Sequence, residues 1–392
     1  MLSCPHDKVR VAENGHDTGS LTVTGVNWCV YNAEWVHDRA IQAAEFVSTH
    51  SWLLPSPPAV IPSLETEVAG LRFRSPLGLA AGFDKSGRAV PFWAALGFGH
   101  VEIGSISAEV SHGNPKPRLW RTAQRERGII VYYGLPNDGC RRVASRLSGV
   151  RRTVPLGINI VNTNRGPGAP AETDDGIIAD YVESVRVLAP HASYLTLNLS
   201  CPNTCDGRGF VSDSGRVVAL LEAVEELRVT RPVFLKVAPF GEVSGLEAFL
   251  KAVERFGYVN GFGINLPPGK PAGFEHWSHL PGAVSGKPCE AAMTRALVDL
   301  YARIDRRRHS ILATGGVFTA EDAYRRIRLG ATLVQFLTAL VYEGPWVVRR
   351  MESGLARLLE RDGFRNIHDA IGVDCGTIKR SSSPHRAVAQ PG

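Results

Sequence analysis

Eight short runs of β-type residues follow one another along the chain, and helical patterns separate most of them. Most of these runs are nearly continuous apolar stretches, which is typical of parallel strands covered on both faces. Eight strand–helix units in about 300 residues predict an α/β fold, a (β/α)8 TIM barrel. A doubly wound sheet is the rival fold, but no Gly-x-Gly-x-x-Gly turn follows the first strand. The expected strands are Leu77–Ala81, Val101–Ile106, Leu156–Val161, Tyr194–Leu199, Val233–Val237, Gly261–Asn265, Ile311–Thr314 and Leu333–Leu337.

The stretch before the first strand predicts a separate helical piece. Apolar residues recur at helical spacing from Val36 to Val47, and Pro55-Ser-Pro-Pro58 ends the pattern. This piece either packs on the barrel as a lid or forms a small cap that touches a membrane surface or admits an apolar co-substrate. The expected divisions are a poorly ordered N-terminus at 1–31, an N-terminal helical cap at 32–60, the barrel at 61–377 and a disordered tail at 378–392.

The composition is that of a soluble globular protein with an excess of positive charge. Hydrophobic residues make up 44% of the chain and charged residues 21%, and no run of about 18 apolar residues predicts a membrane-spanning helix. The net charge of +6 favours an anionic substrate or a phosphate-bearing cofactor. The densest basic run, Arg306–Arg308, is interpreted as the solvated end of a helix, so we expect no nucleic-acid partner. Without a signal-peptide pattern or a Cys-x-x-Cys pair, we expect a cytoplasmic protein with no bound metal.

Polar residues gather where the expected strands end. The most informative stretch runs from Tyr194 to Thr204. Its apolar run ends before Pro202, and amide, hydroxyl and thiol groups lie together there. The carboxyl ends of barrel strands meet at one mouth, which carries the chemistry of barrel enzymes. Two lysines at that mouth favour an anion, and Gly315-Gly316 occupies a loop where barrels commonly bind phosphate. The residues expected there are Gly82, Lys85, Ser105, Asn159, Asn198, Cys201, Asn203, Lys236, Asn265, Gly315, Gly316 and Thr338.

With these residues assembled, the chain resembles the dihydroorotate dehydrogenases, which bind flavin mononucleotide (FMN). The resemblance covers residues 32–372. The order of the motifs and the N-terminal helical extension resemble the class 2 enzymes, which are quinone-linked and membrane-associated. The motifs are Leu77-Gly-Leu-Ala-Ala-Gly-Phe-Asp-Lys85, Gly97-Phe-Gly-His-Val-Glu-Ile-Gly-Ser105, Gly113-Asn-Pro-Lys-Pro-Arg118, Asn198-Leu-Ser-Cys-Pro-Asn203, Leu235-Lys-Val-Ala-Pro239, Ser285-Gly-Lys-Pro288 and Ala313-Thr-Gly-Gly-Val317.

The resemblance implies which residues surround each ligand. Lys236 would place a positive charge near the pyrimidine edge of the flavin and favour its anionic reduced form. In class 2 enzymes the extension admits quinone and contacts the membrane. A quinone partner and a position at the inner face of the cell membrane are therefore implied, with Arg121 beside the quinone route. The residues implied around FMN are Ala81, Gly82, Ser105, Asn159, Asn198, Lys236, Gly286, Gly316, Leu337 and Thr338, and those around the substrate are Lys85, Asn198, Asn203 and Asn265.

The same resemblance implies oxidation of dihydroorotate to orotate in pyrimidine biosynthesis, with Cys201 and Lys85 as catalytic residues. A base removes a proton from the carbon next to a carbonyl, and the adjacent carbon passes a hydride to the flavin. A thiolate is a competent base when its surroundings lower its pKa, and Cys201 is the hypothesised base. Class 2 enzymes usually carry Ser at this position and class 1 enzymes carry Cys, so the chain joins a class 2 extension to a class 1 base. The alternative for Cys201 is a buried, inert thiol.

Three departures from the family pattern lie near the expected substrate. Val131 stands where the family has Asn, Leu266 where it has a hydroxyl residue, and Gly134-Leu-Pro136 where it has Gly-Phe-Asn. Each group left unpaired on a bound orotate would cost roughly 1–3 kcal/mol. Leu337 also replaces a Tyr, which is tolerable if that residue acts through its backbone. Two alternatives remain open: a paralogous FMN oxidoreductase acting on a different cyclic amide or enoyl-type substrate in specialised metabolism, and a barrel that binds FMN or phosphate without turnover.

Overall fold

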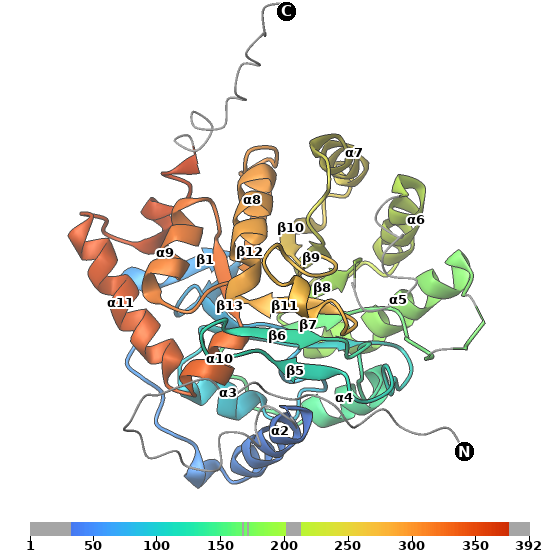
Figure 1. Cartoon of the computed structure of the whole chain (residues 1–392). Coiled ribbons are helices and arrows are strands. Elements are labelled where there is room, and N and C mark those ends of the chain that lie inside the picture. The colour runs from blue at the N-terminus through green and yellow to red at the C-terminus, as the bar shows by residue number, and fades with distance from the viewer. Residues whose placement is uncertain (1–32, 167, 171, 201–212, 376–392) are drawn as a thin grey trace, which may run out of the picture.

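The computed structural model describes residues 33–166, 168–170, 172–200 and 213–375, and its main feature is a closed barrel of eight strands (Figure 1). Neighbouring strands are parallel throughout, in the order β10-β12-β13-β3-β4-β7-β8-β9. They are the eight predicted strands with small shifts at their ends, so the predicted TIM barrel is confirmed. Their bounds are β3 Leu77–Leu79, β4 His100–Ile106, β7 Leu156–Ile160, β8 Tyr194–Asn198, β9 Val233–Val237, β10 Val259–Ile264, β12 Ser310–Thr314 and β13 Leu333–Phe336.

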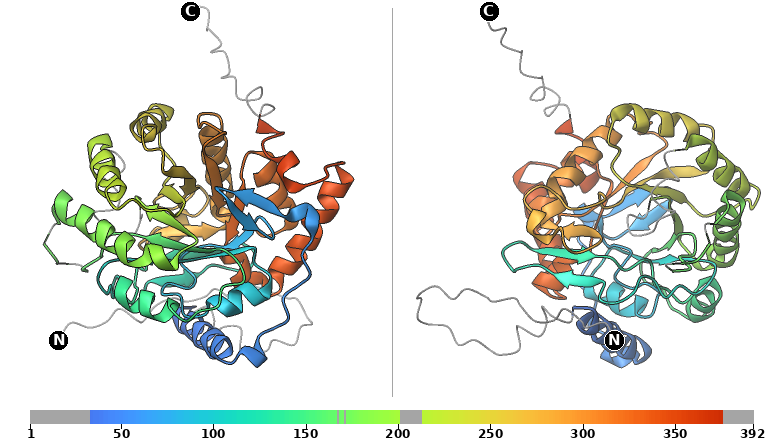
Figure 2. Two further views of the ribbon diagram at one scale, coloured as in Figure 1. Left: turned by 180° about the vertical axis from the view of Figure 1, so that it is seen from behind. Right: turned by 45° about the vertical axis from the view of Figure 1, so that its right-hand side comes forward.

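Helices surround the barrel and cover its outer face (Figure 2). Apolar side chains from the strands and the helices form one continuous core, because the strands are buried on both faces. Burial of this apolar surface is the dominant favourable contribution to folding. The helices are α3 Val90–Leu96, α4 Cys140–Leu147, α5 Asp174–Leu188, α6 Ser214–Glu225, α7 Val243–Val253, α8 Glu290–Tyr301, α9 Ala320–Arg328, α10 Thr338–Glu343 and α11 Val347–Arg361.

A hairpin that we did not predict closes the amino end of the barrel. Its strands β1 (Thr66–Val68) and β2 (Leu71–Phe73) are antiparallel, and Val68 and Phe73 are both buried. They pack with side chains from four barrel strands, namely Tyr194, Phe234, Leu312 and Leu333. The inward-facing side chains at this end therefore form a second, smaller core beneath the hairpin.

A second antiparallel sheet, also not predicted, joins β11 (Ala283–Gly286), β6 (Gly128–Val131) and β5 (Leu119–Arg121), in that order. Helix α2 (Ala33–Thr49) contacts both β5 and α3, and the short turn η1 (Ser51–Leu53) follows it (Figure 1). These two elements occupy the stretch expected to be a helical cap. Among the described residues, no helix has the length and apolar character needed to cross a bilayer.

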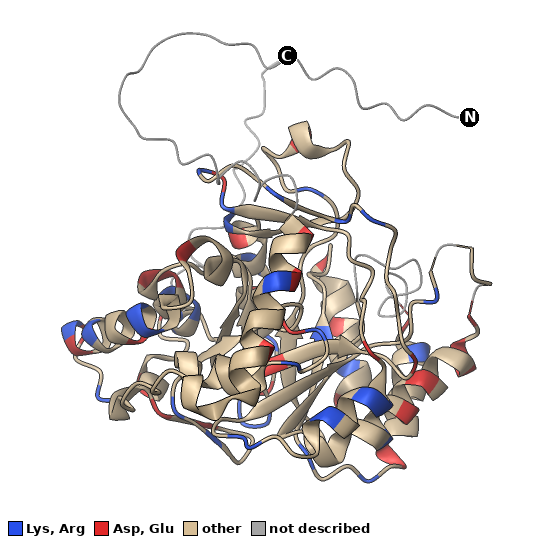
Figure 3. Cartoon of the chain, turned by 90° about the horizontal axis from the view of Figure 1, so that it is seen from below, with Lys and Arg blue, Asp and Glu red and all other residues tan. Residues whose placement is uncertain are grey.

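Charged residues lie mainly on the outer helices, where both signs occur on the same helices (Figure 3). Helix α9 is an example, because Glu321 and Asp322 lie in its first turn and three arginines lie in its last turn. This order complements the helix dipole. The stretches expected to be a poorly ordered N-terminus and a disordered tail, 1–31 and 378–392, lie outside the described residues.

Candidate active site

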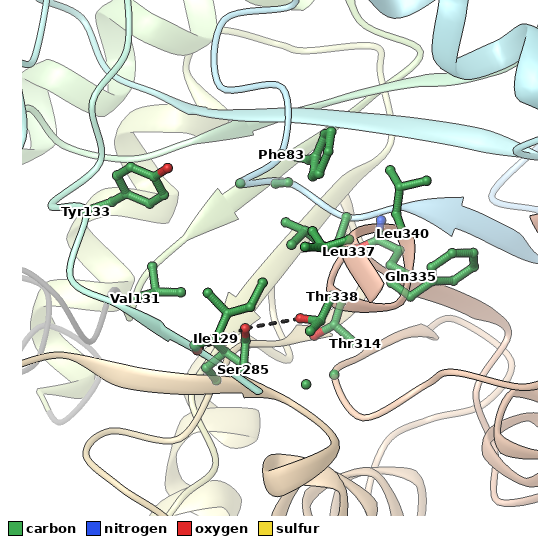
Figure 4. Close-up of a pocket in the computed structure, with 18 of the residues that line it drawn as sticks. Phe83, Ile129, Val131, Tyr133, Ser285, Thr314, Gln335, Leu337, Thr338 and Leu340 are labelled. Atoms are coloured by element: carbon green, nitrogen blue, oxygen red, sulfur yellow. Dashed lines mark hydrogen bonds between the residues drawn. The ribbon is translucent and has the colours of Figure 1, made fainter. Parts of the chain in front are cut away.

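A cavity of about 440 Å³ opens at the carboxyl ends of the barrel strands, with α2 and the β5-β6-β11 sheet contributing to its wall. Its size is within the usual range of about 300–1,000 Å³ for ligand pockets. Figure 4 shows Ile129, Val131 and Ser285 on one side, facing Leu337 and Thr338, with the Tyr133 ring at one end. The hydroxyl oxygens of Ser285 and Thr338 lie 3.1 Å apart across this space.

The structure brings most of the predicted site residues to this one cavity. Asn159 is fully buried one layer below, where its Oδ1 accepts a hydrogen bond from the cavity residue Ser105 at 2.5 Å. Cys201 and Asn203 lie outside the described residues, so their assigned roles stay predictions. The predicted residues that line the cavity are Ala81, Gly82, Lys85, Ser105, Asn198, Lys236, Asn265, Gly286, Gly316, Leu337 and Thr338.

A chain of polar side chains connects the barrel interior to the cavity wall. Glu102, on β4, accepts a hydrogen bond of 2.9 Å from Nδ2 of Asn159. Ser105 Oγ donates to Asn159 Oδ1 and accepts from Asn198 Nδ2 at 3.1 Å. Asn198 Oδ1 in turn accepts from Asn265 Nδ2 at 3.1 Å. Each amide is thus oriented by its neighbour, and this series of hydrogen bonds begins at Glu102.

Glu102 accepts hydrogen bonds from several sides and is 1% exposed. Besides Asn159, it accepts from Tyr194 OH at 3.2 Å, Thr196 Oγ1 at 3.2 Å and Gln335 Nε2 at 2.9 Å. The side-chain nitrogens of Asn159 and Gln335 can only donate, so each of these amides must turn its NH2 group toward Glu102. The carboxylate therefore determines the orientation of the polar groups above it.

Lys85 and His37 meet inside the cavity, although they come from the barrel and from α2. Lys85 Nζ donates to His37 Nε2 at 3.0 Å and lies 4.0 Å from the centre of the Tyr133 ring. Burial, and secondarily the Lys85 charge, hold the pKa of His37 well below its usual value, so the imidazole is neutral. Burial likewise lowers the pKa of Lys85 to about 8, although Asp38 and Glu34 oppose the shift. Lys85 is therefore an ammonium that loses its proton unusually easily.

A buried ion pair holds α2 beside this cluster. Arg118 donates to Oε1 of Glu34 from both Nε at 3.1 Å and Nη2 at 3.0 Å, and it lies 5.4 Å from the Tyr133 ring. Both partners are buried, at 8% and 9% exposure. Removing one partner of such a pair leaves an uncompensated charge, which is costly. The contact therefore fixes the first turn of α2 against the cavity wall.

Two glycines of the cavity wall cannot carry a side chain. Gly286 has a φ of +94°, and a Cβ there would lie 2.2 Å from the carbonyl oxygen of Arg127. Gly316 has a φ of +75°, and its Cβ would lie 2.7 Å from Cα of Glu290. A ligand at this end of the cavity would therefore meet bare backbone, which suits close approach by a phosphate group.

The opposite part of the wall, between α2 and α10, is mostly apolar. Arg121 is the exception, and its Nη2 donates to the carbonyl oxygen of Val341 at 2.6 Å. Its guanidinium also lies 5.2 Å from the Tyr342 ring. The apolar residues there are Ala33, Val36, Ala40, Leu119, Leu337, Leu340 and Val341.

The residues that depart from the family pattern also line the cavity. Val131 and Leu266 are both part of its wall, as are Leu135 and Pro136. Asn265, next to Leu266, already donates to Asn198 and to the Ser200 carbonyl oxygen, the latter at 2.7 Å. The substituted residues therefore add apolar surface beside amides that hydrogen-bond to each other.

Sequence reasoning missed two residues that the structure makes prominent. His37 lies within the helical pattern of α2 and was not singled out. Glu102 was quoted inside a motif but received no role. Its signal was available, because a carboxylate in a buried strand rarely lacks partners.

Comparisons with known proteins agree with this geometry. Residues 63–359 match the sequence profile of a family described as Dihydroorotate dehydrogenase. A dihydroorotate dehydrogenase (quinone) from Anaeromyxobacter sp. (strain Fw109-5) is 39% identical over 330 residues, which cover 83% of this chain and 89% of the relative. One from Mycobacterium tuberculosis (strain ATCC 25177 / H37Ra) is 36% identical over 324 residues, covering 79% and 85%.

Solved structures show the same fold. The crystal structure of DHODH in complex with ferulenol from Eimeria tenella superposes with a TM-score of 0.77 at 28% sequence identity. The match covers 88% of this chain and 98% of that one. The family profile spans most of the barrel, and the relatives are similar over nearly their whole length. The chain therefore belongs to the dihydroorotate dehydrogenase family, whose members are flavin-dependent oxidoreductases acting on CH–CH donors.

Proposed function

We propose that this protein oxidises dihydroorotate to orotate in pyrimidine biosynthesis, with FMN as its cofactor and a quinone as electron acceptor. The observation that carries the proposal is that one cavity combines three kinds of wall. One part of its wall is bare glycine backbone, another carries two lysines and two amides, and a third is apolar and borders α2. Relatives that are 36–39% identical and carry the name dihydroorotate dehydrogenase (quinone) support the same activity.

The residues present fit FMN. Gly286 and Gly316 leave room for the phosphate, and Ser285 and Thr338 add hydroxyl groups nearby. Ser105 and Asn198 would meet the ring, and Lys236, which is 7% exposed, brings a cation to the same wall. When bound, FMN supplies the hydride acceptor for the oxidation.

The chain's own residues would bind the substrate and move its proton. Lys85 would hold the anionic substrate, and the amides of Asn198 and Asn265, with Asn203, would orient its ring. Cys201, as a thiolate, would take the proton from the carbon next to the carbonyl. The hydrogen bonds that begin at Glu102 keep the amides of Asn198 and Asn265 oriented while this happens.

The test is a purified protein mixed with dihydroorotate in the absence of oxygen. We expect the yellow flavin absorbance to bleach on mixing and to return when a quinone is added. Cys201→Ala is expected to slow the bleaching about 100-fold. Cys201→Ser keeps a hydroxyl base and is expected to retain part of the wild-type bleaching rate. A colourless protein would refute the flavin assignment, and bleaching within a few fold of the normal rate in Cys201→Ala would refute the role of the thiol.

A second candidate substrate is a less polar cyclic amide or enoyl compound. The observation that favours it is the apolar wall formed by Val131, Leu135, Pro136 and Leu266. An orotate titration of the wild type and of Val131→Asn separates the two candidates. If dihydroorotate is the substrate, the wild type binds orotate tightly and the added amide changes little. If orotate binds the wild type weakly and binds Val131→Asn about tenfold more tightly, the second candidate is favoured.

For the quinone, we propose that it enters between α2 and α10, beside Arg121. A quinone is lipid-soluble, so this end of the protein would sit at the inner face of the cell membrane. Exposed aromatic side chains support this, because Trp35 and Phe46 on α2 are 46% and 57% exposed and Trp52 in η1 is 80% exposed. Cosedimentation with lipid vesicles should decrease in a Phe46→Ser, Trp52→Ser variant, and an unchanged bound fraction would contradict membrane contact.

A further inference from the structure

Arg326, on α9, is a buried cation behind the cavity wall. It is 3% exposed, and its Nη2 donates to two main-chain oxygens, those of Gly315 and Glu290, each at 3.1 Å. Its Nη1 is buried and has no hydrogen-bond partner within the described ranges. Burial lowers the pKa of Arg326, although the nearby charges of Glu290 and Asp322 oppose the shift. A buried guanidinium held mainly by carbonyl oxygens calls for an explanation.

The basic residues around Arg326 are paired with carboxylates. Lys287 Nζ lies 2.7 Å from Glu290 Oε2 and 3.0 Å from Asp322 Oδ1. Arg325 Nη1 lies 3.4 Å from Glu290 Oε1. Glu290 and Asp322, whose charges act on Arg326, therefore already pair with other cations, and within the described residues Arg326 itself donates to carbonyl oxygens.

The position of Arg326 connects this charge to the cavity. Gly315 and Gly316 line the cavity, and both have a positive φ, of +82° and +75°. Arg326 holds the Gly315 carbonyl from the α9 side. In a trans peptide the N–H points opposite to the C=O, so the N–H of Gly316 is directed away from α9. One guanidinium therefore both orients this peptide and places positive charge behind it.

We propose that Arg326 is a positioning residue for the phosphate of the cofactor, acting as its buried countercharge through the Gly315–Gly316 peptide. This inference rests on the proposed function, because it takes the ligand at these glycines to be FMN. A phosphate carries between one and two negative charges near neutral pH. Its binding would supply the opposite charge that Arg326 lacks, and an arginine one layer away would attract it without touching it.

The test compares FMN with riboflavin, which has the same ring but no phosphate. Protein stripped of flavin is titrated with each, and binding is followed by quenching of flavin fluorescence. Arg326→Met should weaken FMN binding about 10- to 100-fold and leave riboflavin binding within about twofold. Arg326→Lys, which keeps the charge, should retain most of the preference for FMN. The matched control is Arg325→Met, the next residue on the same helix, whose side chain is 59% exposed; it should change neither affinity.

The outcomes separate a countercharge from a purely structural role. If Arg326→Met weakens FMN and riboflavin by the same factor, Arg326 only supports the loop and the inference is wrong. If Arg326→Met does not fold, Arg326→Lys decides, because a loss of its preference for FMN over riboflavin would also overturn the inference. A wild type that binds neither flavin would overturn the proposed function and this inference together. A wild type that prefers FMN, with the preference unchanged in the variants, would overturn the inference alone.

Discussion

Glu102 and Asn159 form a hydrogen bond of 2.9 Å inside the barrel, and this contact determines which end of the Asn159 amide faces Ser105. Because Glu102 is an acceptor, Asn159 must present its Oδ1 to Ser105. Glu102→Gln would remove that constraint, since an amide can donate as well as accept. We expect the variant to bind FMN and riboflavin about tenfold more weakly, and by the same factor, because the affected groups face the ring.

Thr196→Val is the control for this prediction. It removes one of the donors to Glu102, at 3.2 Å, without changing the partner of Asn159. Flavin titrations of the two variants should therefore differ. If Glu102→Gln binds both flavins as tightly as the wild type does, the carboxylate has no part in orienting the site.

Lys85 should make ligand binding depend on pH. Its ammonium has a pKa of about 8, so the positive charge is present below that pH and is lost above it. If this charge holds an anionic ligand, orotate should bind progressively more weakly as the pH rises above 8. Isothermal titration calorimetry at pH values from roughly 6.5 to 9.5 measures the dissociation constant of orotate. Lys85→Met should bind orotate weakly at every pH, and a wild type with no weakening above pH 8 would contradict the role of Lys85.

Glu352, on α11, should make the stability of the fold depend on pH. It is 4% exposed, and burial raises its pKa from 4.5 to about 7, against the opposing charges of Arg74 and Arg349. Its folded-state pKa lies above its unfolded value. The stability it contributes is therefore fully present below pH 4.5 and is lost as the pH rises through 7. Glu352→Gln should remove this loss, which amounts to about 2–3 kcal/mol.

Chemical denaturation at pH 4.5 and at pH 8 measures this difference. The free energy of unfolding of Glu352→Gln, relative to the wild type, should be higher at pH 8 than at pH 4.5. Glu360→Gln, at an exposed position on the same helix, should show no such change between the two values of pH. Equal behaviour of the two variants would show that Glu352 does not titrate in this range.

Gly157, on β7, should not tolerate a side chain. A Cβ there would lie 2.2 Å from Cζ of Tyr194, which is 1% exposed and packs beneath the hairpin. Gly157→Ala is expected to lower the free energy of unfolding by about 1–3 kcal/mol, because the tyrosine cannot move aside in a packed barrel. Gly149→Ala, where no atom lies within 4 Å, is the control. Similar unfolding midpoints for the two variants would contradict the close packing of Tyr194.

The barrel could be predicted from sequence because its strands are locally distinctive. Val233–Val237 was predicted with its observed bounds, since it is a β-type run between turn residues. The hairpin β1-β2 was missed because two three-residue strands carry too little pattern to stand out. The sheet β5-β6-β11 was missed for another reason, since β11 joins β6 from more than 150 residues away and such pairing depends on tertiary structure.

The site residues likewise fall into those that could be predicted from the sequence and those that could not. Residues at the carboxyl ends of strands, such as Lys236 and Asn265, were predicted to meet because barrel topology brings strand ends together. His37 was missed because its contact with Lys85 depends on where α2 docks, and no local pattern encodes that position. Arg326 was missed because an arginine in the last turn of a helix normally faces solvent.

On helix α2, His37 contacts Lys85 and the carboxylate of Glu34 accepts from Arg118. The helix is therefore part of the cavity wall as well as the proposed membrane contact. A chain shortened to its barrel would lack Glu34, the carboxylate partner of Arg118, and the α2 part of the cavity wall would be replaced by bulk water. Shortened forms of the protein should therefore keep the chain from Ala33 onward, and a ligand bound against α2 would contact residues that line the cavity.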